Sequence, residues 1–346
     1  MRTRQIGAAT VTAVGCGELS LATSAARGVP ARELEHVVHE ALGFGVSLID
    51  VTADADSEKL AGQVVRELRA RDRVVVAIRV QLLDERPGAP RRDMLRERLP
   101  PAYLQDRVEA ALRTTRLDAL PLAQLPLAPA WLGSPAWPEL VGTCARLVRE
   151  GKVLAWGAQL DDAADPAAPA LLAEPWLAAL SVVYHLCDRR AEPLFEAAAK
   201  RELAVLARRP FAGGALAGSL GPGVKLPPRD DRNALDAATL ERVALGVAGL
   251  AGLVKREPAA ARSSDAARQT AERARAPAVR PEHLECDDVA ELALRWVIER
   301  AGVALPRLHR SAHVIPAVVA GAAPPLSADL ASRIDQLFGQ IPGRGD

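Results

Sequence analysis

The side chains best able to do acid–base chemistry in this sequence are few. Only two tyrosines occur, Tyr103 and Tyr184, so a mechanism that needs a phenol has two candidates. Tyr184 is followed at once by His185 and, three residues later, by Asp188. A histidine beside a carboxylate can act as an acid or base near neutral pH, which makes His185 a candidate catalytic residue. The alternative is that Tyr184 packs in the core and His185 fills a structural position.

Histidine spacing also raises the question of a metal site. His36 and His39 are three residues apart in a predicted helix, and His309 and His313 are four apart. Neither pair has a third ligand nearby in the sequence, so we expect surface or half-buried histidines and no metal site. The four cysteines form no Cys-x-x-Cys pair. This usage indicates free thiols in a reducing compartment, and we expect a cytoplasmic protein.

Composition excludes several classes of protein. The 346 residues carry 44 Lys and Arg against 43 Asp and Glu, a net charge of +1, which argues against nucleic-acid binding through bulk charge. Hydrophobic residues make up 49% of the chain, enough for a sizeable core. No uninterrupted apolar run is long enough for a membrane-spanning helix. Partners are therefore expected to be a small molecule or another protein.

Short apolar runs alternate with helical patterns along nearly the whole chain. The expected strands are Val11–Gly17, Val46–Val51, Val74–Val80, Leu120–Leu125, Val153–Leu160, Leu180–Leu186, Leu203–Arg208 and His313–Val319. Several of these runs lack polar alternation, as is typical of parallel strands covered on both faces. Eight such units predict an α/β fold, a (β/α)8 TIM barrel forming a single domain over residues 1–346. Residues 221–287 are expected to be a partly irregular insertion between the seventh and eighth strands, rich in Ala and Arg over 258–281.

Several of these segments resemble motifs of the aldo/keto reductases. Residues 45–54, GVSLIDVTAD, followed by 57–62, SEKLAG, are similar to that family's G-x-x-F-I-D-T-A-D and S-E-x-x-L-G signature. Residues 149–157, REGKVLAWG, 182–192, VVYHLCDRRAE, and 207–218, ARRPFAGGALAG, resemble later motifs in the same order. The resemblance covers nearly the whole chain and implies the family's barrel, with its site at the C-terminal mouth.

The resemblance implies a catalytic tetrad of Asp, Tyr, Lys and His, most of which this chain lacks. The aspartate is Asp50. The tyrosine position falls at Ala55 or Asp56, the lysine position at Arg79 and the histidine position at Pro126. An arginine cannot serve as an acid near neutrality, so we expect Arg79 to form an ion pair with Asp50. Asp56 could replace the acid only if burial raised its pKa, and a solvated carboxylate is the simpler interpretation.

The nucleotide site that the resemblance implies is altered as well. In the family, a Ser-Asn pair and a Gln hold the nicotinamide amide. The positions of the Ser-Asn pair are occupied here by Gln159 and Leu160, and the position of the Gln is occupied by Ser181. Residues 315–319, taken to follow the eighth strand, lack the family's basic residue. Arg208 matches family members and is expected at the barrel mouth, and Gly213 lies where a barrel loop can bind phosphate, or simply reverses the chain.

These replacements predict an aldo/keto reductase-like protein that has lost NADPH-dependent carbonyl reduction. We expect no cofactor or weak NADP(H) binding, and a role as a binding or regulatory pseudoenzyme. The alternative is a divergent NADPH-dependent oxidoreductase, or a redox-free enzyme that uses Asp50, Arg79, His185 and Arg208 in the old pocket. An open cavity with Arg79 free of Asp50 would favour the enzyme. A mouth closed by Pro126, Leu160 and Val319 would favour the binding protein.

Overall fold

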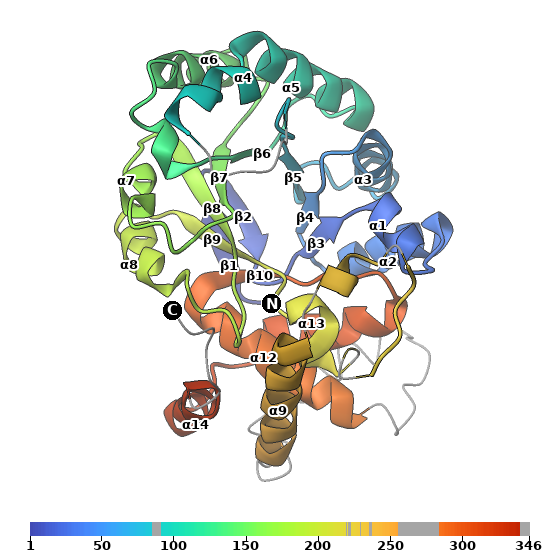
Figure 1. The fold of residues 1–346 in the computed structure, drawn as a ribbon. Helices are drawn as coiled ribbons and strands as arrows, with labels where there is room; N and C mark the ends of the chain where they lie inside the picture. Colours follow the sequence, from blue (N-terminus) through green and yellow to red (C-terminus); the bar gives the residue numbers. More distant parts are fainter. Residues whose placement is uncertain are drawn as a thin grey trace.

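Eight parallel strands form a barrel surrounded by helices in the computed structural model (Figure 1). The structure describes residues 1–84, 91–218, 220, 223–228, 230–234, 237–254 and 284–339. The barrel strands are β3 (Cys16–Leu19), β4 (Leu48–Val51), β5 (Val75–Arg79), β6 (Leu122–Pro126), β7 (Trp156–Leu160), β8 (Leu177–Val183), β9 (Ala204–Arg208) and β10 (Gly302–Leu305). They pair in chain order, and the expected (β/α)8 architecture is confirmed.

The last strand meets the first through backbone hydrogen bonds. The Gly15 amide donates to the Ala304 carbonyl (3.0 Å), and the Gly17 amide donates to the Pro306 carbonyl (2.9 Å). A β-carbon on Gly17 would lie 2.1 Å from the Leu305 carbonyl oxygen. Glycine is therefore required here because the two backbones approach closely where the barrel closes.

Helices cover the outside of the barrel. The longer ones are α2 (Ala31–Gly43), α3 (Ala55–Glu67), α5 (Pro101–Thr115), α6 (Trp137–Arg149), α8 (Glu192–Lys200), α9 (Ala237–Val254), α12 (Leu284–Ala301), α13 (Val314–Ala322) and α14 (Ala328–Gly339). Shorter helices are α1 (Leu21–Ala26), α4 (Leu95–Arg98) and α7 (Ala168–Leu172), with 3-10 turns η1 (Arg92–Met94), η2 (Pro129–Trp131), η3 (Ala212–Ala217), η4 (Asp231–Ala234) and η6 (Ser311–His313). No helix in the described part of the chain is long and apolar enough to span a bilayer.

Apolar side chains fill the barrel interior up to its last layer. A hairpin of β1 (Thr3–Ile6) and β2 (Ala9–Thr12) places Ile6 and Val11 in a buried cluster with barrel residues. The barrel residues of this cluster are Leu48, Val75, Ala77, Leu122, Ala179, Ala204, Leu206, Val303 and Leu305. Because these residues alternate along their strands, the next inward positions toward the C-terminal end are Asp50, Arg79, Gln124, Ser181 and Arg208.

Two strand predictions were wrong. The segment His313–Val319 is not a strand: it contains the end of η6 and most of α13, and the eighth strand is β10. Val314, Val318 and Val319 of α13 are buried, so its apolar, β-branched pattern suits a largely buried helix as well as a strand. The predicted Val11–Gly17 strand is split between β2 and β3. Val11 belongs to the hairpin that closes the barrel's N-terminal end.

Residues 57–62 of α3, SEKLAG, contact the elements packed around this helix. Ser57 Oγ accepts a hydrogen bond from the Leu21 amide (2.8 Å), and Glu58, fully buried, forms an ion pair with Arg107 of α5. A β-carbon on Gly62 would lie 2.1 Å from the Thr115 carbonyl oxygen. This stretch therefore joins α3 to its neighbours and contributes no reactive group to the mouth.

The predicted insertion does lie between the seventh and eighth barrel strands, β9 and β10. Its described part contains η4 and α9, and α12 begins at Leu284, inside the predicted range. Most of the Ala/Arg-rich segment, including residues 258–281, lies outside the described residues.

Candidate functional site

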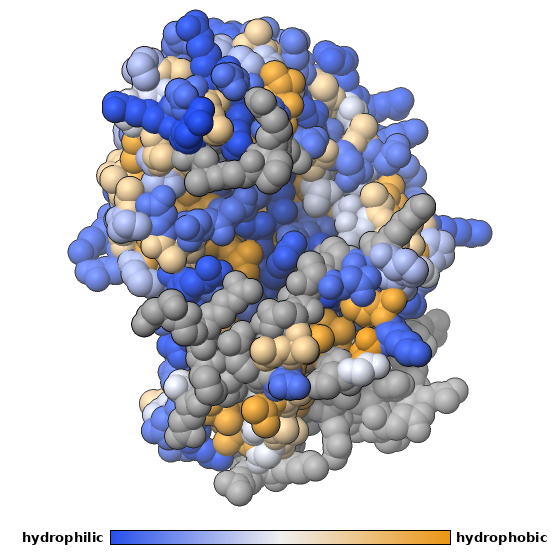
Figure 2. Space-filling view, in the orientation of Figure 1, coloured by the Kyte–Doolittle hydropathy of each residue, from blue (hydrophilic) through white to orange (hydrophobic). Residues whose placement is uncertain are grey.

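Polar side chains replace apolar ones in the uppermost layer of the barrel. Asp50, Arg79, Gln124, Ser181 and Arg208 come from five different strands at or near their C-terminal ends. Hydrophilic residues line the hollow at the centre of the face seen in Figure 2. The C-terminal mouth is where barrel proteins place their functional groups, so this layer is the candidate site.

Asp50 is fully buried, and all its partners are protein groups. Arg79 donates from Nε to Asp50 Oδ1 (3.1 Å) and from Nη2 to Oδ2 (2.5 Å). Gln124 Nε2 donates to Oδ1 (2.8 Å), and the Glu18 amide donates to Oδ2 (3.0 Å). The predicted Asp50–Arg79 ion pair is confirmed, so Arg79 is not free of Asp50.

Glu18 is the second buried carboxylate of the mouth, and the sequence analysis missed it. Four guanidinium groups surround it. Arg307 Nη2 lies 2.7 Å from Oε2, while Arg79 Nη1, Arg209 Nε and Arg208 Nη1 lie 3.5, 3.6 and 3.9 Å from Oε1. Burial alone would raise the pKa of the Glu18 carboxyl, but the surrounding arginines lower it to about 2. Glu18 is therefore ionised at neutral pH. The sequence could have indicated Glu18 as a site residue, because it is a carboxylate at the end of the first barrel strand, β3.

Arg208 lies at the mouth, as expected from the sequence. It is 5% exposed, and its Nη2 donates to Asp161 Oδ1 (3.2 Å) and the Leu160 carbonyl (3.4 Å). Burial and the nearby Arg79 lower the pKa of Arg208. Its Nε atom is buried without a hydrogen-bond partner in the described part of the chain.

The positions that the resemblance assigns to the remaining tetrad members hold no buried acid. Ala55 and Asp56 are exposed in the first turn of α3, after Asp54, which caps the helix by accepting from the Ser57 amide (2.8 Å). Asp56 therefore does not act as the buried substitute acid. Pro126 ends β6, where its side chain offers no donor.

Tyr184 and His185 lie just beyond the end of β8 rather than in the strand. The Tyr184 ring stacks on Trp296 with centroids 5.3 Å apart, and its hydroxyl donates to Glu192 Oε1 (2.7 Å). His185 and Asp188 exchange backbone hydrogen bonds, but the Asp188 carboxylate binds Arg190, at 2.6 Å for the shorter contact.

His185 therefore lacks the acid–base geometry that was considered for it. Its Nδ1 is buried without a partner, and burial lowers its pKa to about 4, so the ring is neutral at pH 7. Its charged neighbours are Asp188, Arg209 and Arg190, not Asp50 or Arg79. The structural interpretation of Tyr184 and His185 fits this arrangement.

The residues at the nicotinamide positions are bound to other protein groups or buried. Gln159 Nε2 donates to Asp161 Oδ1 (3.1 Å), which also binds Arg208. Leu160 is 1% exposed and belongs to the core outside the barrel, so it does not close the mouth. Ser181 Oγ is buried without a partner. Gly213 has φ +72° and its carbonyl accepts from Arg232 Nη1 (3.4 Å), which supports its role in reversing the chain.

The conclusion that the eighth strand lacks a following basic residue was wrong. Because β10 ends at Leu305, the residues that follow it are Pro306, Arg307 and, three positions on, Arg310. Arg307 binds Glu18, and Arg310 Nη1 lies 3.6 Å from Glu33 Oε1. Val319 is buried in the helix α13 rather than lying at the end of a barrel strand.

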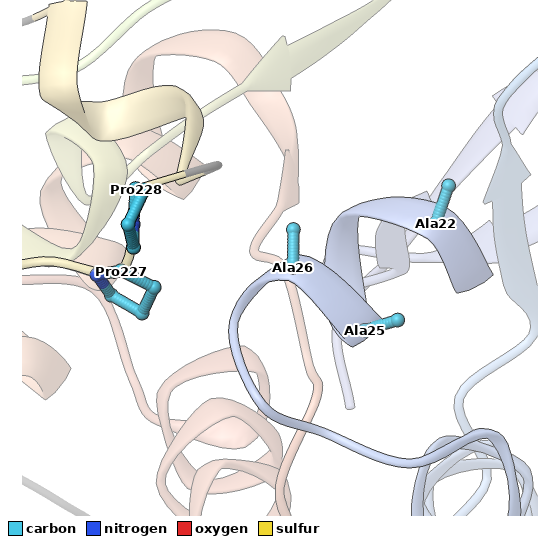
Figure 3. A pocket seen from close by; sticks show the side chains of 5 residues that line it. All are labelled: Ala22, Ala25, Ala26, Pro227 and Pro228. Carbon is cyan, nitrogen blue, oxygen red and sulfur yellow. The ribbon is translucent and has the colours of Figure 1, made fainter.

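A separate cleft of about 450 Å³ lies beside α1 (Figure 3). It is lined by Ala22, Ala25, Ala26, Pro227 and Pro228. None of the side chains of these described residues carries a polar group, so they offer apolar contact.

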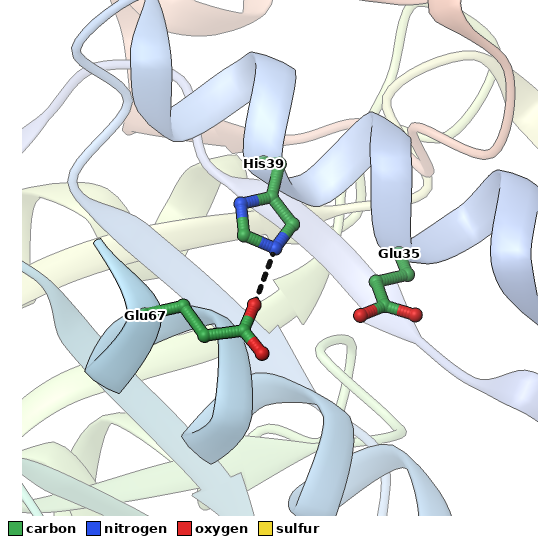
Figure 4. Close-up of side chains that lie close together, drawn as sticks. All are labelled: Glu35, His39 and Glu67. Carbon is green, nitrogen blue, oxygen red and sulfur yellow. Dashed lines mark hydrogen bonds and ion pairs between the residues drawn. The ribbon is translucent and has the colours of Figure 1, made fainter.

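His39 lies among two carboxylates rather than beside His36. Its Nε2 is 2.9 Å from Glu67 Oε2, and ligand atoms of Glu35, His39 and Glu67 all lie within 4.8 Å (Figure 4). Gln63 Nε2 donates to both Glu35 (3.0 Å) and Glu67 (2.9 Å). These hydrogen bonds tie α2 to α3.

The eight parallel strands and their surrounding helices define a (β/α)8 TIM barrel with a polar layer at its C-terminal mouth. The sequence profile of the aldo/keto reductase family matches residues 13–338, and the chain belongs to that family. A comparison with curated protein sequences finds no match.

Solved structures agree on the fold. The glycerol dehydrogenase AKR11B4 from Gluconobacter oxydans is similar with a TM-score of 0.71 and 19% identity, over 99% of this chain and 97% of that one. The aldo-keto reductase AKR11C1 from Bacillus halodurans, in its holo form, gives 0.65 and 20%, over 97% and 96%. An aldo-keto reductase from Klebsiella pneumoniae in complex with NADPH gives 0.62 and 23%, over 99% and 96%.

Proposed function

We propose that this aldo/keto reductase family member is a binding or regulatory pseudoenzyme of the cytoplasm that does not reduce carbonyls with NADPH. The observation that carries the proposal is the Asp50–Arg79 ion pair. At the position where the family's lysine would tune a tyrosine, a guanidinium is held by two carboxylates, Asp50 and Glu18. Their charges raise the pKa of Arg79 even though burial opposes this, so it releases no proton near neutrality.

The missing acid would be costly for carbonyl reduction. A positioned general acid contributes roughly 10²–10⁴ in rate, because the carbonyl oxygen must gain a proton as hydride arrives. Ala55 and Pro126 have no proton to give, and Asp56 is exposed. Tyr184 cannot substitute, since its hydroxyl already donates to Glu192 and burial raises its pKa.

Nucleotide binding is proposed to be weak or absent. The solved Klebsiella reductase binds NADPH, but here Gln159 is engaged with Asp161, and Arg307 is engaged with Glu18. Gln159 and Arg307 would have to break these hydrogen bonds before they could bind the nucleotide. Arg307 and Arg310 keep positive charge after the eighth strand, which favours weak binding over none.

Titration of NADPH and NADP⁺ into the purified protein by calorimetry tests the proposal. We expect weak binding or none. Tight, saturable binding of either nucleotide, together with reduction of a carbonyl, would support the alternative of a divergent NADPH-dependent oxidoreductase.

A further inference from the structure

Among the described residues, guanidinium groups outnumber carboxylates at the barrel mouth. The arginine cluster consists of Arg79, Arg208, Arg209 and Arg307, each with a guanidinium nitrogen within 3.9 Å of Glu18. Two other carboxylates share it: Asp50 binds Arg79, and Asp161 binds Arg208. In the part of the chain that the structure describes, three carboxylates thus face four guanidiniums. Asp161 and Arg209 are 77% and 52% exposed, so water screens their charges. The mouth is therefore suited to an additional anion.

Hydrogen-bonding capacity is also unused at this point of the barrel. Arg208 Nε and Ser181 Oγ, on the adjacent strands β9 and β8, are buried without hydrogen-bond partners among the described residues. Arg208 and Ser181 are 5% and 1% exposed. Buried donors without acceptors are unfavourable, and a charged oxygen is the strongest acceptor that could satisfy them. An oxygen-bearing anion would therefore satisfy both donors.

Glu18, whose carboxylate lies in the arginine cluster, has a backbone conformation that glutamate rarely adopts. Its φ is +47°, in the left-handed region, although it is not glycine. Such conformations persist only where the surroundings hold them, and they gather at functional sites. Here the Glu18 carboxylate is held by the guanidiniums and its amide by Asp50. The cluster therefore already receives one carboxylate, supplied by the chain itself.

We propose that the arginine cluster is a binding site for a small organic carboxylate, and that Glu18 is a built-in competitor occupying part of it in the free protein. The inference rests on the proposed binding role of the mouth and names its ligand class. A free carboxylate would bring the same two oxygens as Glu18 without the left-handed backbone. It would also supply acceptors for Arg208 Nε and Ser181 Oγ.

Calorimetric titration of acetate and malonate into the wild type and Glu18→Gln tests this, with ionic strength held constant by sodium chloride. Because the competing charge is gone, Glu18→Gln should bind the carboxylate about tenfold more tightly than the wild type. Equal or weaker affinity in Glu18→Gln would overturn the competitor role. Inorganic phosphate is titrated in parallel. Binding of phosphate without binding of either carboxylate would overturn the assigned ligand class.

Two further variants keep the test decisive if Glu18→Gln folds poorly. Glu18→Gly suits the left-handed backbone and should show the same gain, with circular dichroism confirming the fold. Arg208→Met in the same background should abolish the gain, whereas Arg113→Met, 71% exposed on α5, should keep it. Carboxylate binding that survives Arg208→Met would place the ligand elsewhere and refute the proposal. The outcome is separate from that of the nucleotide titration, since no nucleotide is present.

Discussion

The guanidinium of Arg79 is bound in two places to the carboxylate of Asp50, at 3.1 Å and 2.5 Å. Both side chains come from the polar layer that ends the barrel interior, and Asp50 is fully buried. The pair falls at the positions that the sequence resemblance assigns to the aspartate and lysine of the family's catalytic tetrad. The structural and functional predictions both begin from this pair.

Arg79→Met should strongly destabilise the protein. It leaves Asp50 and Glu18 buried close together without the cation between them, and breaking a buried pair in this way costs about 3–5 kcal/mol. Urea unfolding measures the loss. Arg71→Met is the matched control, because its partner Asp118 is 92% exposed and the pair contributes less than about 1 kcal/mol. Similar losses in the two variants would contradict the buried network.

Glu18 should make stability depend on pH in the acid range. Its folded pKa is about 2 against 4.5 for the free side chain. Its contribution is fully present above about pH 4.5 and is lost as the pH falls toward 2, with a total on the order of 3 kcal/mol. Urea unfolding between pH 5 and about 2 should therefore show a shallower decline for Glu18→Gln than for the wild type.

The control for this pH profile is Glu196→Gln. Glu196 is 79% exposed in its pair with Lys200, so its removal should leave the acid decline close to that of the wild type. If Glu18→Gln and the wild type lost stability in parallel, the arginines would not be lowering the pKa of Glu18 as described.

Gly62→Ala should disrupt the contact between α3 and α5. The new β-carbon would lie 2.1 Å from the Thr115 carbonyl oxygen, which belongs to the backbone and cannot swing away. We expect a loss of about 1–3 kcal/mol in thermal or urea unfolding. Gly142→Ala in α6, with nothing within 4 Å, should instead be neutral or stabilising by up to about 1 kcal/mol. Equal effects of the two substitutions would speak against the close packing.

Tyr184→Phe should lower the free energy of unfolding without changing ligand affinity. The hydroxyl donates to the Glu192 carboxylate, and a hydrogen bond to a charged group contributes about 1.5–3 kcal/mol. The ring remains able to stack on Trp296. Acetate and nucleotide titrations of the variant should match those of the wild type. A changed affinity would show that Tyr184 contributes to the binding site and would contradict its structural role.

The barrel was predictable because its parallel strands are continuous apolar runs with family motifs in register. The Asp50–Arg79 pair was predictable too, since two opposite charges at the ends of neighbouring strands must meet. The eighth strand was misplaced because the buried helix α13 is as apolar and β-branched as a strand, and that error concealed Arg307. Glu18 was missed because its importance depends on four arginines from distant parts of the chain.

NADPH oxidation by the wild type in the presence of excess aldehyde and ketone substrates tests the central claim most directly. The proposed function predicts a rate indistinguishable from that of NADPH and substrate without protein, at nucleotide concentrations high enough to overcome weak binding. Carbonyl-dependent oxidation of NADPH that disappears in Asp50→Asn would contradict it, because it would show that the altered mouth still holds NADPH for hydride transfer and supplies a proton to the carbonyl.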